Sequence, residues 1–537
     1  FERLQKTYTK IDNVQFAFDP ADGELSNSLE ILRAVEALTE IAWQLPYSIR
    51  VDSISNYQHT EVMDDDLIVE DLYSSANDLT SADISKVSKV ASSEPSLIGR
   101  LHDKMHRSTA VNVTVQLPGA DPMEVVEVSE AARAMALKIE SEYGVSIRLG
   151  GITMFNNAFS EASMNDMMTL VPAMYVVILF VTFLVIRSIY ATLSVIFVIF
   201  PCIFVAMGFG GWINVGLTPA SMSAPTIITT LAVADSIHFL VSMLNHKKAG
   251  HSHYESIIYS LQVNGKPIFL TSITTAVGFL SLNFSDSPPF HDLGNITAFG
   301  VMAAWLFSIT LLPILISFVD VKPRSTVGFL NSYMDRIGNL IADNHKSVLV
   351  ISLIVSVLLI ASVPKNEIND DFLKYFDEDI SFRADTDWIS QNLSGLNAIQ
   401  FDMRSVGDNG ISDPAFLNKL DLFATWAREH ELVTNVQSIT DVFKRLNRDL
   451  NGGDENFYVI PKDRELAAQY LLLYELSLPF GLDLNNQIDI NKSSTQVIVT
   501  IEDLTTNEIR SWISEAEEFL SNEVGIDAVA AGPTVMF

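Results

Sequence analysis

The sequence Ala224-Pro225-Thr226-Ile227-Ile228-Thr229-Thr230-Leu231-Ala232-Val233-Ala234-Asp235-Ser236-Ile237-His238-Phe239-Leu240-Val241 holds an acid and a histidine inside an otherwise apolar run. With its continuation to Leu244, the run is long enough to cross a bilayer as a helix, which takes about 20 residues. A charged side chain at mid-membrane costs about 2.5–3.5 kcal/mol on insertion scales. Asp235 and His238 share a helix face, and Thr229 lies near it. We expect this face to look into protein or a wet cavity.

The composition is that of a membrane protein with sizeable soluble parts. The chain has 537 residues, of which 48% are hydrophobic, and its mean hydropathy is +0.25. A formal net charge of −31 argues against nucleic acid as a partner. The single cysteine, Cys202, excludes an intrachain disulfide and a cysteine-rich metal site. No nucleophile–base pair, phosphate-binding loop or zinc pattern stands out, so we predict no enzyme, no cofactor and no metal.

Six hydrophobic spans are predicted, at about 168–186, 191–211, 223–244, 267–284, 293–318 and 347–363. Basic residues fall in or beside alternate connections between them: Arg187, Lys247, Lys248, Lys266, Lys322, Arg324, Arg336 and Lys346. The loops 212–218 and 285–292 carry no lysine or arginine. The positive-inside rule therefore puts the basic connections in the cytoplasm and both soluble regions on the outer side.

The two soluble regions repeat one another. In the first, strand-like segments at 14–18, 50–54, 111–115 and 145–149 alternate with helical patterns at 28–43 and 121–143. Four segments recur in order in the second region: 14–16 matches 399–401, 51–54 matches 436–439, 109–115 matches 495–501, and 150–155 matches 532–537. We therefore predict two copies of one α+β domain built from βαβ units in a ferredoxin-like way.

The domain order follows from these patterns. We expect an α+β domain at 1–165, five membrane helices at 166–320, an amphipathic connector at 321–346, a membrane helix at 347–363 and a second α+β domain at 364–537. A span precedes the second copy and five spans follow the first. If each copy has the same surroundings, the sequence is incomplete at both ends.

Four features carry a resemblance to a known superfamily. They are the duplicated outer domain, the lead-in from Gly150 to Phe155, the acidic segment 232–238, and the run 277–313 with Ser287-Pro288-Pro289, Gly294, Gly300 and Leu311-Leu312-Pro313. Together they resemble the resistance–nodulation–division (RND) superfamily, and within it the MMPL-type exporters of hydrophobes and amphiphiles. Patched-like and sterol-sensing proteins are more distant relatives.

The resemblance implies an α-helical membrane bundle with two periplasmic porter-type domains, in a bacterial inner membrane. It implies export of hydrophobic or amphiphilic, lipid-like molecules driven by the proton-motive force, with protons and membrane lipids as partners. It leaves open a homo-oligomer or a periplasmic adaptor. Two alternatives remain at this point: an accessory of protein export resembling SecD and SecF, and a sterol-sensing receptor that does not transport.

The resemblance also implies a site. Many relatives carry a glycine and two adjacent polar residues in the fourth helix, where this chain has Ala232, Ala234 and Asp235. Asp235 is then the proton-coupling carboxylate, and His238 is a candidate to share the relay. Further candidates are polar residues for relay or helix contact, and glycines that allow close helix packing: Thr229, Thr271 and Thr275, and Gly208, Gly211 and Gly278. The alternative role for the polar residues is structural hydrogen bonding between helices.

Overall fold

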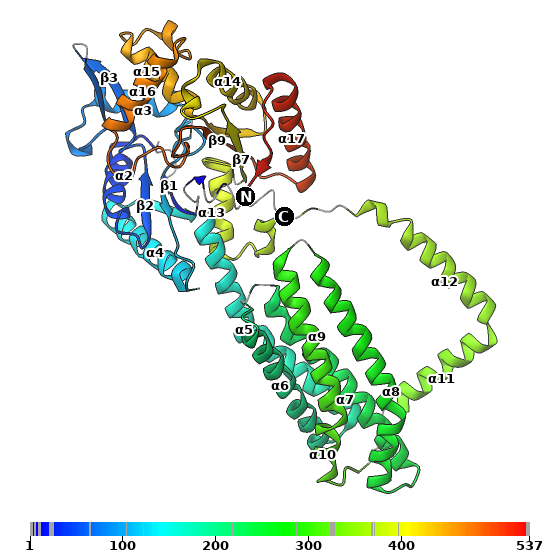
Figure 1. The fold of residues 1–537 in the computed structure, drawn as a ribbon. Helices are drawn as coiled ribbons and strands as arrows, with labels where there is room; N and C mark the ends of the chain where they lie inside the picture. Colours follow the sequence, from blue (N-terminus) through cyan, green and yellow to red (C-terminus); the bar gives the residue numbers. More distant parts are fainter. Residues whose placement is uncertain are drawn as a thin grey trace. The chain divides into compact units, whose positions relative to one another are not determined.

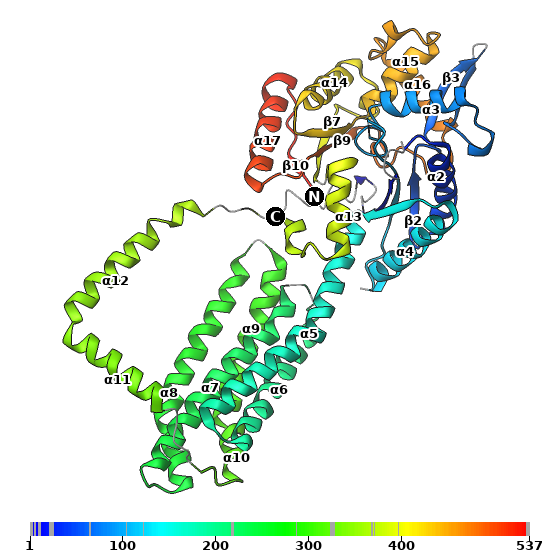
Figure 2. The same ribbon diagram turned by 180° about the vertical axis from the view of Figure 1, so that it is seen from behind.

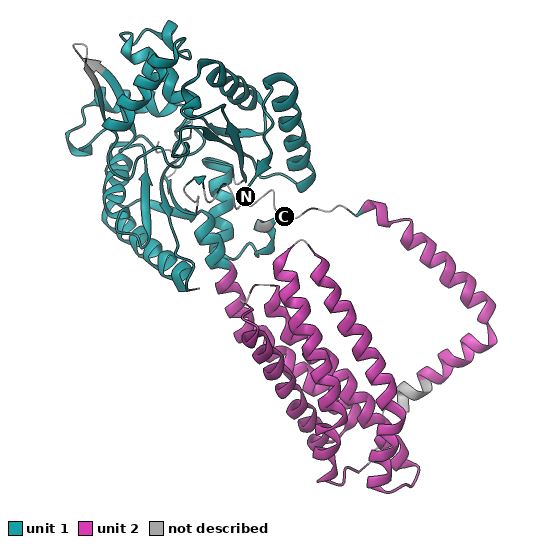
Figure 3. Cartoon of the chain, viewed as in Figure 1, with its two compact units in different colours: residues 1–158, 366–537 teal, residues 159–365 magenta. Residues whose placement is uncertain are grey.

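The computed structural model describes the chain except for residues 1–3, 5–6, 9–11, 21–25, 64–65, 104, 122, 216–217, 219, 286, 323–327, 367–368, 370, 396 and 533–537. The second half of the predicted match 150–155 to 532–537 therefore lies almost wholly outside the described residues. The chain divides into two compact units (Figure 3). One holds residues 1–158 and 366–537, and the other holds 159–365.

Six helices are long and apolar enough to cross a membrane. They are α5 (Ile152–Ile186), α6 (Ile189–Trp212), α7 (Ala224–Lys248), α8 (His253–Leu280), α9 (Pro288–Ile309) and α12 (His345–Ile360). The short helix α10 (Leu311–Ser317) follows α9 after a break, because the ring of Pro313 clashes with the carbonyl group four residues earlier. Helix α11 (Gly328–Asp343) occupies most of the predicted amphipathic connector. Each of the six predicted spans corresponds to one of these helices.

The first α+β copy is built on a four-stranded antiparallel sheet in the order β2-β5-β1-β6. Its elements are β1 (Asn13–Asp19), α2 (Leu29–Ala42), β2 (Ser48–Asp52), β5 (Thr109–Val115), α4 (Met123–Tyr143) and β6 (Ser146–Gly150). Phe16 of β1 is fully buried and lies opposite Val111 of β5 and Leu149 of β6. Helices α2 and α4 pack together beside this sheet (Figures 1 and 2).

The second α+β copy has the same strand order. Its elements are β7 (Asn397–Arg404), α14 (Pro414–Glu429), β8 (Val433–Gln437), β9 (Ser494–Ile501), α17 (Thr506–Phe519) and β10 (Ala530–Ala531). The order β10-β7-β9-β8, read backwards, matches β2-β5-β1-β6 element for element. The segments 111–115 and 497–501 lie in β5 and β9, which hold equivalent places. Phe401, Phe423 and Trp512 fill the core between the second sheet and its helices.

Each copy carries an insertion at the same point, between its second and third sheet strands. The first insertion holds β3 (Gln58–Met63), β4 (Asp66–Asp71) and α3 (Ser81–Ser93). The second holds α15 (Ile439–Leu450) and α16 (Arg464–Ser477). Strand β3 packs against α15, so the two insertions meet (Figure 1). We call this contact the insertion seam.

The copies also exchange contacts near their first strands. Helix α13 (Ser381–Asn392), which precedes β7, packs on β6 of the first copy. Arg148 on β6 forms ion pairs with Asp19 at 2.9 Å and with Asp385 of α13 at 3.3 Å. In the other direction, the hydroxyl group of Tyr8 lies 2.9 Å from Asp402 of β7. These reciprocal contacts make the two copies one compact unit.

Candidate functional site

Asp235 is buried near the middle of α7. The helix begins with Pro225 in its first turn, where a missing N–H costs nothing, and it ends with a basic turn at His246, Lys247 and Lys248. It packs against α6, α8 and α9, and these helices cover the face that holds Asp235. Only 8% of Asp235 is exposed. The chain therefore holds a carboxyl group inside an apolar bundle.

Two neighbouring helices contribute polar atoms near this carboxyl group. Ser272 on α8 lies near the carboxyl group of Asp235 and is itself buried. Cys202 on α6 lies near the same carboxyl group and is fully buried. Ser236, the next residue on α7, is also fully buried. Asp235 thus sits where α6, α7 and α8 meet.

His238 lies on a different part of α7. Its side chain is exposed, as are those of Thr226 and Thr230, which share its face at four-residue spacing. The described residues therefore do not bring His238 into the buried surroundings of Asp235. Instead, α7 presents one buried face with an acid and one open face with a histidine and two threonines.

The three candidate threonines have separate environments. Thr229 is fully buried, and its hydroxyl group lies 3.2 Å from that of Tyr175 on α5. Thr271 is exposed and donates a hydrogen bond of 2.9 Å to the carbonyl group of Ile268 on its own helix. Thr275 is half-buried on α8. Thr229 therefore links two helices, whereas Thr271 hydrogen-bonds within one.

The close helix approaches fall at other glycines than those predicted. A Cβ atom built at Gly208, Gly211 or Gly278 would meet no atom of the described residues within 4 Å. A Cβ atom at Gly300 on α9 would overlap Ile228 of α7, and one at Gly294 would overlap the carbonyl group of Phe279. Among the described residues these three glycines have open faces and α9 makes the tight contacts, so close packing at Gly208, Gly211 and Gly278 stays a prediction.

Comparison with known protein families gives a match that includes this helix bundle. Residues 76–326, which include α5 to α10 and Asp235, match the model of the MMPL family. This segment of the chain is thus similar to the MMPL family. This confirms the resemblance to RND-type transporters that the sequence indicated. The matched segment begins in the first α+β copy and ends just after the bundle.

Two curated relatives are similar to parts of the chain. The hopanoid transporter HpnN of Burkholderia multivorans is 26% identical over 237 residues, which are 42% of this chain and 26% of that protein. A membrane protein of Methanocaldococcus jannaschii is 27% identical over 106 residues, which are 20% of this chain and 27% of that protein. The matched segments thus span about a quarter of the length of each relative.

Ser272 is not among the candidates named from the sequence. On the same helix those candidates are Thr271 and Thr275. The buried positions of α8 include Ile268, Ser272 and Ala276, which recur every four residues. That spacing marks the face that packs on the bundle. Helical periodicity through Ala276 could therefore have singled out Ser272 as the hydroxyl group that faces Asp235.

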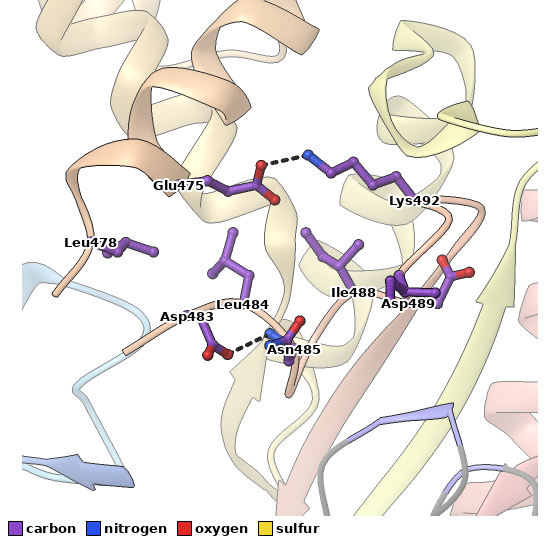
Figure 4. A pocket seen from close by; sticks show the side chains of 9 residues that line it. Glu475, Leu478, Asp483, Leu484, Asn485, Ile488, Asp489 and Lys492 are labelled. Carbon is purple, nitrogen blue, oxygen red and sulfur yellow. Dashed lines mark hydrogen bonds and ion pairs between the residues drawn. The ribbon is translucent and has the colours of Figure 1, made fainter. Parts of the chain in front are cut away.

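Outside the bundle of membrane helices, the second α+β copy carries a small open pocket of about 210 Å³ (Figure 4). Leu478, Leu484 and Ile488 form its apolar wall, and the ion pair of Glu475 with Lys492 closes one side at 2.5 Å. Among the described residues, no three histidine, cysteine or acidic side chains come together as a metal site requires. The buried acid in the bundle is therefore the feature with the clearest chemistry.

Proposed function

We propose that this protein exports lipid-like hydrophobic or amphiphilic molecules, driven by protons that Asp235 binds and releases. The observation that carries the proposal is the buried carboxyl group of Asp235 inside an apolar helix of the segment that matches the MMPL family. An acid at this depth is costly to keep unless its protonation is used. Each proton that crosses the membrane supplies about 2.3 kcal/mol per 100 mV of potential.

The neighbours of Asp235 support two packings of the bundle. When the carboxyl group is protonated it is neutral, and it can pack against α8 with Ser272 as its hydrogen-bond partner. When it is ionised, the single hydroxyl group of Ser272 compensates the charge poorly, and water or a cation must approach. Protonation therefore biases the α7–α8 contact toward one of two arrangements, which is what a coupled transporter needs.

The open face of α7 is the proposed route to Asp235. A face that carries Thr226, Thr230 and His238 is unfavourable against lipid tails, so we propose that a further membrane helix or a water-filled path covers it. His238 lies on this open face, one helical turn after the buried Asp235. In that position it can pass a proton toward the carboxyl group without being part of its buried surroundings.

The proposed substrate class is argued from the curated relatives and from the two sheet-containing α+β copies. A curated relative is called a hopanoid transporter, and we propose a lipid of comparable hydrophobic character here. We further propose that both α+β copies lie on the outer, periplasmic side of an inner membrane, where they receive the lipid. The basic last turn of α7, with Lys247 and Lys248, supports this orientation, because lysines and arginines beside membrane helices favour the cytoplasmic side.

The proposed orientation predicts where a membrane-impermeant thiol reagent reacts. Ser141→Cys on α4 and Ser477→Cys on α16 should label in intact spheroplasts, and Lys248→Cys should label only after the membrane is opened. All three side chains are exposed, so access depends on the side of the membrane alone. The native Cys202 is buried and gives little background. Labelling of Lys248→Cys but not Ser141→Cys in intact spheroplasts would reverse the orientation.

The transport proposal is tested with the full-length protein in liposomes that contain a labelled hopanoid-type lipid. An imposed proton gradient should drive movement of the lipid between membranes or to an acceptor, and a protonophore should stop it. Mass spectrometry of lipids that co-purify with the protein identifies what it binds. Lipid that binds but never moves under a gradient would favour a receptor over a transporter.

A further inference from the structure

Helix α15 buries its charged face. Apolar residues at Ile439, Phe443 and Leu446 face the core of the second copy, as expected for an amphipathic helix. The opposite face would ordinarily be in water. Here, however, the polar side chains of α15 are also buried: Asp441, Lys444, Arg445, Asn447 and Asp449 are each at most 8% exposed. Elements of the first copy, including β3 and the end of α3, lie over this face and form the insertion seam.

The acids of α15 at the seam have close cationic partners. Asp441 pairs with Arg428 at 2.5 Å, and Asp449 pairs with Arg448 at 2.8 Å. Asp449 also accepts a hydrogen bond from Thr60 of β3. Short ion pairs of this kind compensate the loss of hydration when carboxylates are buried.

Glu94, which follows α3, is the exception. It is 7% exposed and accepts a hydrogen bond of 3.0 Å from the hydroxyl group of Tyr57. Arg445 forms an ion pair with Glu94 at 3.7 Å, which is longer than the pairs of Asp441 and Asp449 and beyond hydrogen-bonding distance. Its guanidinium group instead donates to the hydroxyl groups of Tyr57 and Tyr474, between whose rings it lies.

Other charged and titratable groups also face Glu94. From α15 and the segment after it they are Asp441, Arg445, Arg448, Asp449, Glu455 and Tyr458. Four of these carry or can carry negative charge, and Arg448 is already paired with Asp449 and Glu455. The surroundings therefore favour a neutral Glu94 over an ionised one.

Asp52, in the same compact unit, is a buried carboxylate whose negative charge is compensated by two neighbouring arginines. It is buried to the same degree as Glu94, yet Arg50 and Arg100 each contact it at 2.9 Å. Burial alone would raise the pKa of Asp52, but the two arginines outweigh burial and lower the pKa to about 2. Glu94 has no such pair of contacts among the described residues.

We propose that the insertion seam is a proton-dependent latch, in which Glu94 takes up a proton when the two α+β copies close on each other and loses it when they part. The partner of Glu94 in the closed state is the Tyr57–Arg445–Tyr474 stack. This inference does not depend on the transport proposal, because it concerns only contacts within the sheet-containing unit.

The direction of the effect follows from linkage. Burial raises the pKa of Glu94 to about 7, Arg448 opposes this, and the nearby acids add to it. In the parted state Glu94 is hydrated and its pKa returns to the ordinary value of 4.5. The closed seam therefore binds more protons between these two values, so it is most stable at acidic pH and weakens as the pH rises toward 7.

Hydrogen–deuterium exchange of the full chain tests the latch. We follow peptides that cover β3 and α15 at pH 5.5 and pH 8, with each rate divided by its intrinsic chemical rate. Protection of both segments should fall by roughly thirtyfold between the two pH values, as linkage requires for a pKa that moves from 4.5 to about 7. In Glu94→Gln the side chain stays neutral, and protection should be high and independent of pH.

The matched control is Glu455→Gln. Glu455 also lies near Arg448 but its side chain is 77% exposed, so this variant should keep the wild-type pH dependence. Wild-type protection that does not change with pH overturns the latch whether or not a variant folds. An unchanged pH dependence in a folded Glu94→Gln assigns the titration to another group and overturns it equally.

Discussion

Asp235→Asn is expected to reduce proton-coupled lipid movement to the level of protein-free liposomes while the protein stays folded. Asparagine has nearly the same shape as aspartic acid and fits the same buried position beside Ser272, but it cannot bind and release a proton. If Asp235 only holds helices together, the variant should work, because a neutral amide is cheaper to bury than a carboxylate. Transport and proton flux are measured together in proteoliposomes of the full-length protein.

Asp166→Asn on α5 is the matched control. It makes the same chemical change on another membrane helix, at an exposed position, so transport should be unaffected. Ser272→Ala and His238→Ala should each give partial defects, because neither removes the titrating group. Wild-type coupling in Asp235→Asn would show that the carboxyl group is structural and would point to a different energy source.

The membrane helices could be predicted because their signal is local. Apolar runs of sufficient length appear directly in the sequence, and all six predicted spans correspond to helices. The internal repeat was also visible, since β5 and β9 carry similar alternating residues. The helix boundaries were less accurate: α8 begins at His253, well before the predicted span at 267, because its first turns are polar and still helical.

The insertion seam could not be predicted, because it depends on contacts between distant segments. The pattern of α15 is that of an ordinary surface helix, with Ile439, Phe443 and Leu446 on one face and charges on the other. Nothing in that stretch shows that residues near Tyr57 and Glu94 cover the charged face. The same limit applies to the glycines, since only the packing of α9 distinguishes Gly300 from Gly208.

The second large effect that we expect is a loss of stability on substitution of Gly99, in the turn after α3. Gly99 has φ of +69°, and a Cβ atom there would overlap the carbonyl group of Thr434 at the start of β8. The neighbouring Asn435 holds the same turn by donating to the carbonyl groups of Pro95 and Ile98 at 2.9 and 2.8 Å. The backbone of the first copy thus lies directly on a strand of the second, with room for glycine alone.

Gly99→Ala should therefore destabilise the contact between the copies by about 3 kcal/mol, from left-handed strain of about 1 kcal/mol and overpacking of about 1–3 kcal/mol. Gly144→Ala isolates the first contribution, the strain. Gly144 has a nearly identical φ of +70°, but a Cβ atom there meets no described atom within 4 Å, so only the strain remains. The midpoint of thermal unfolding, followed by tryptophan fluorescence, should fall several degrees further for Gly99→Ala than for Gly144→Ala.

Equal shifts in the two variants would mean that the turn does not rest on β8. A larger shift for Gly99→Ala, together with faster amide exchange in β8, would show that this backbone contact stabilises the joined copies alongside the contacts of Arg148, Tyr8 and the insertion seam.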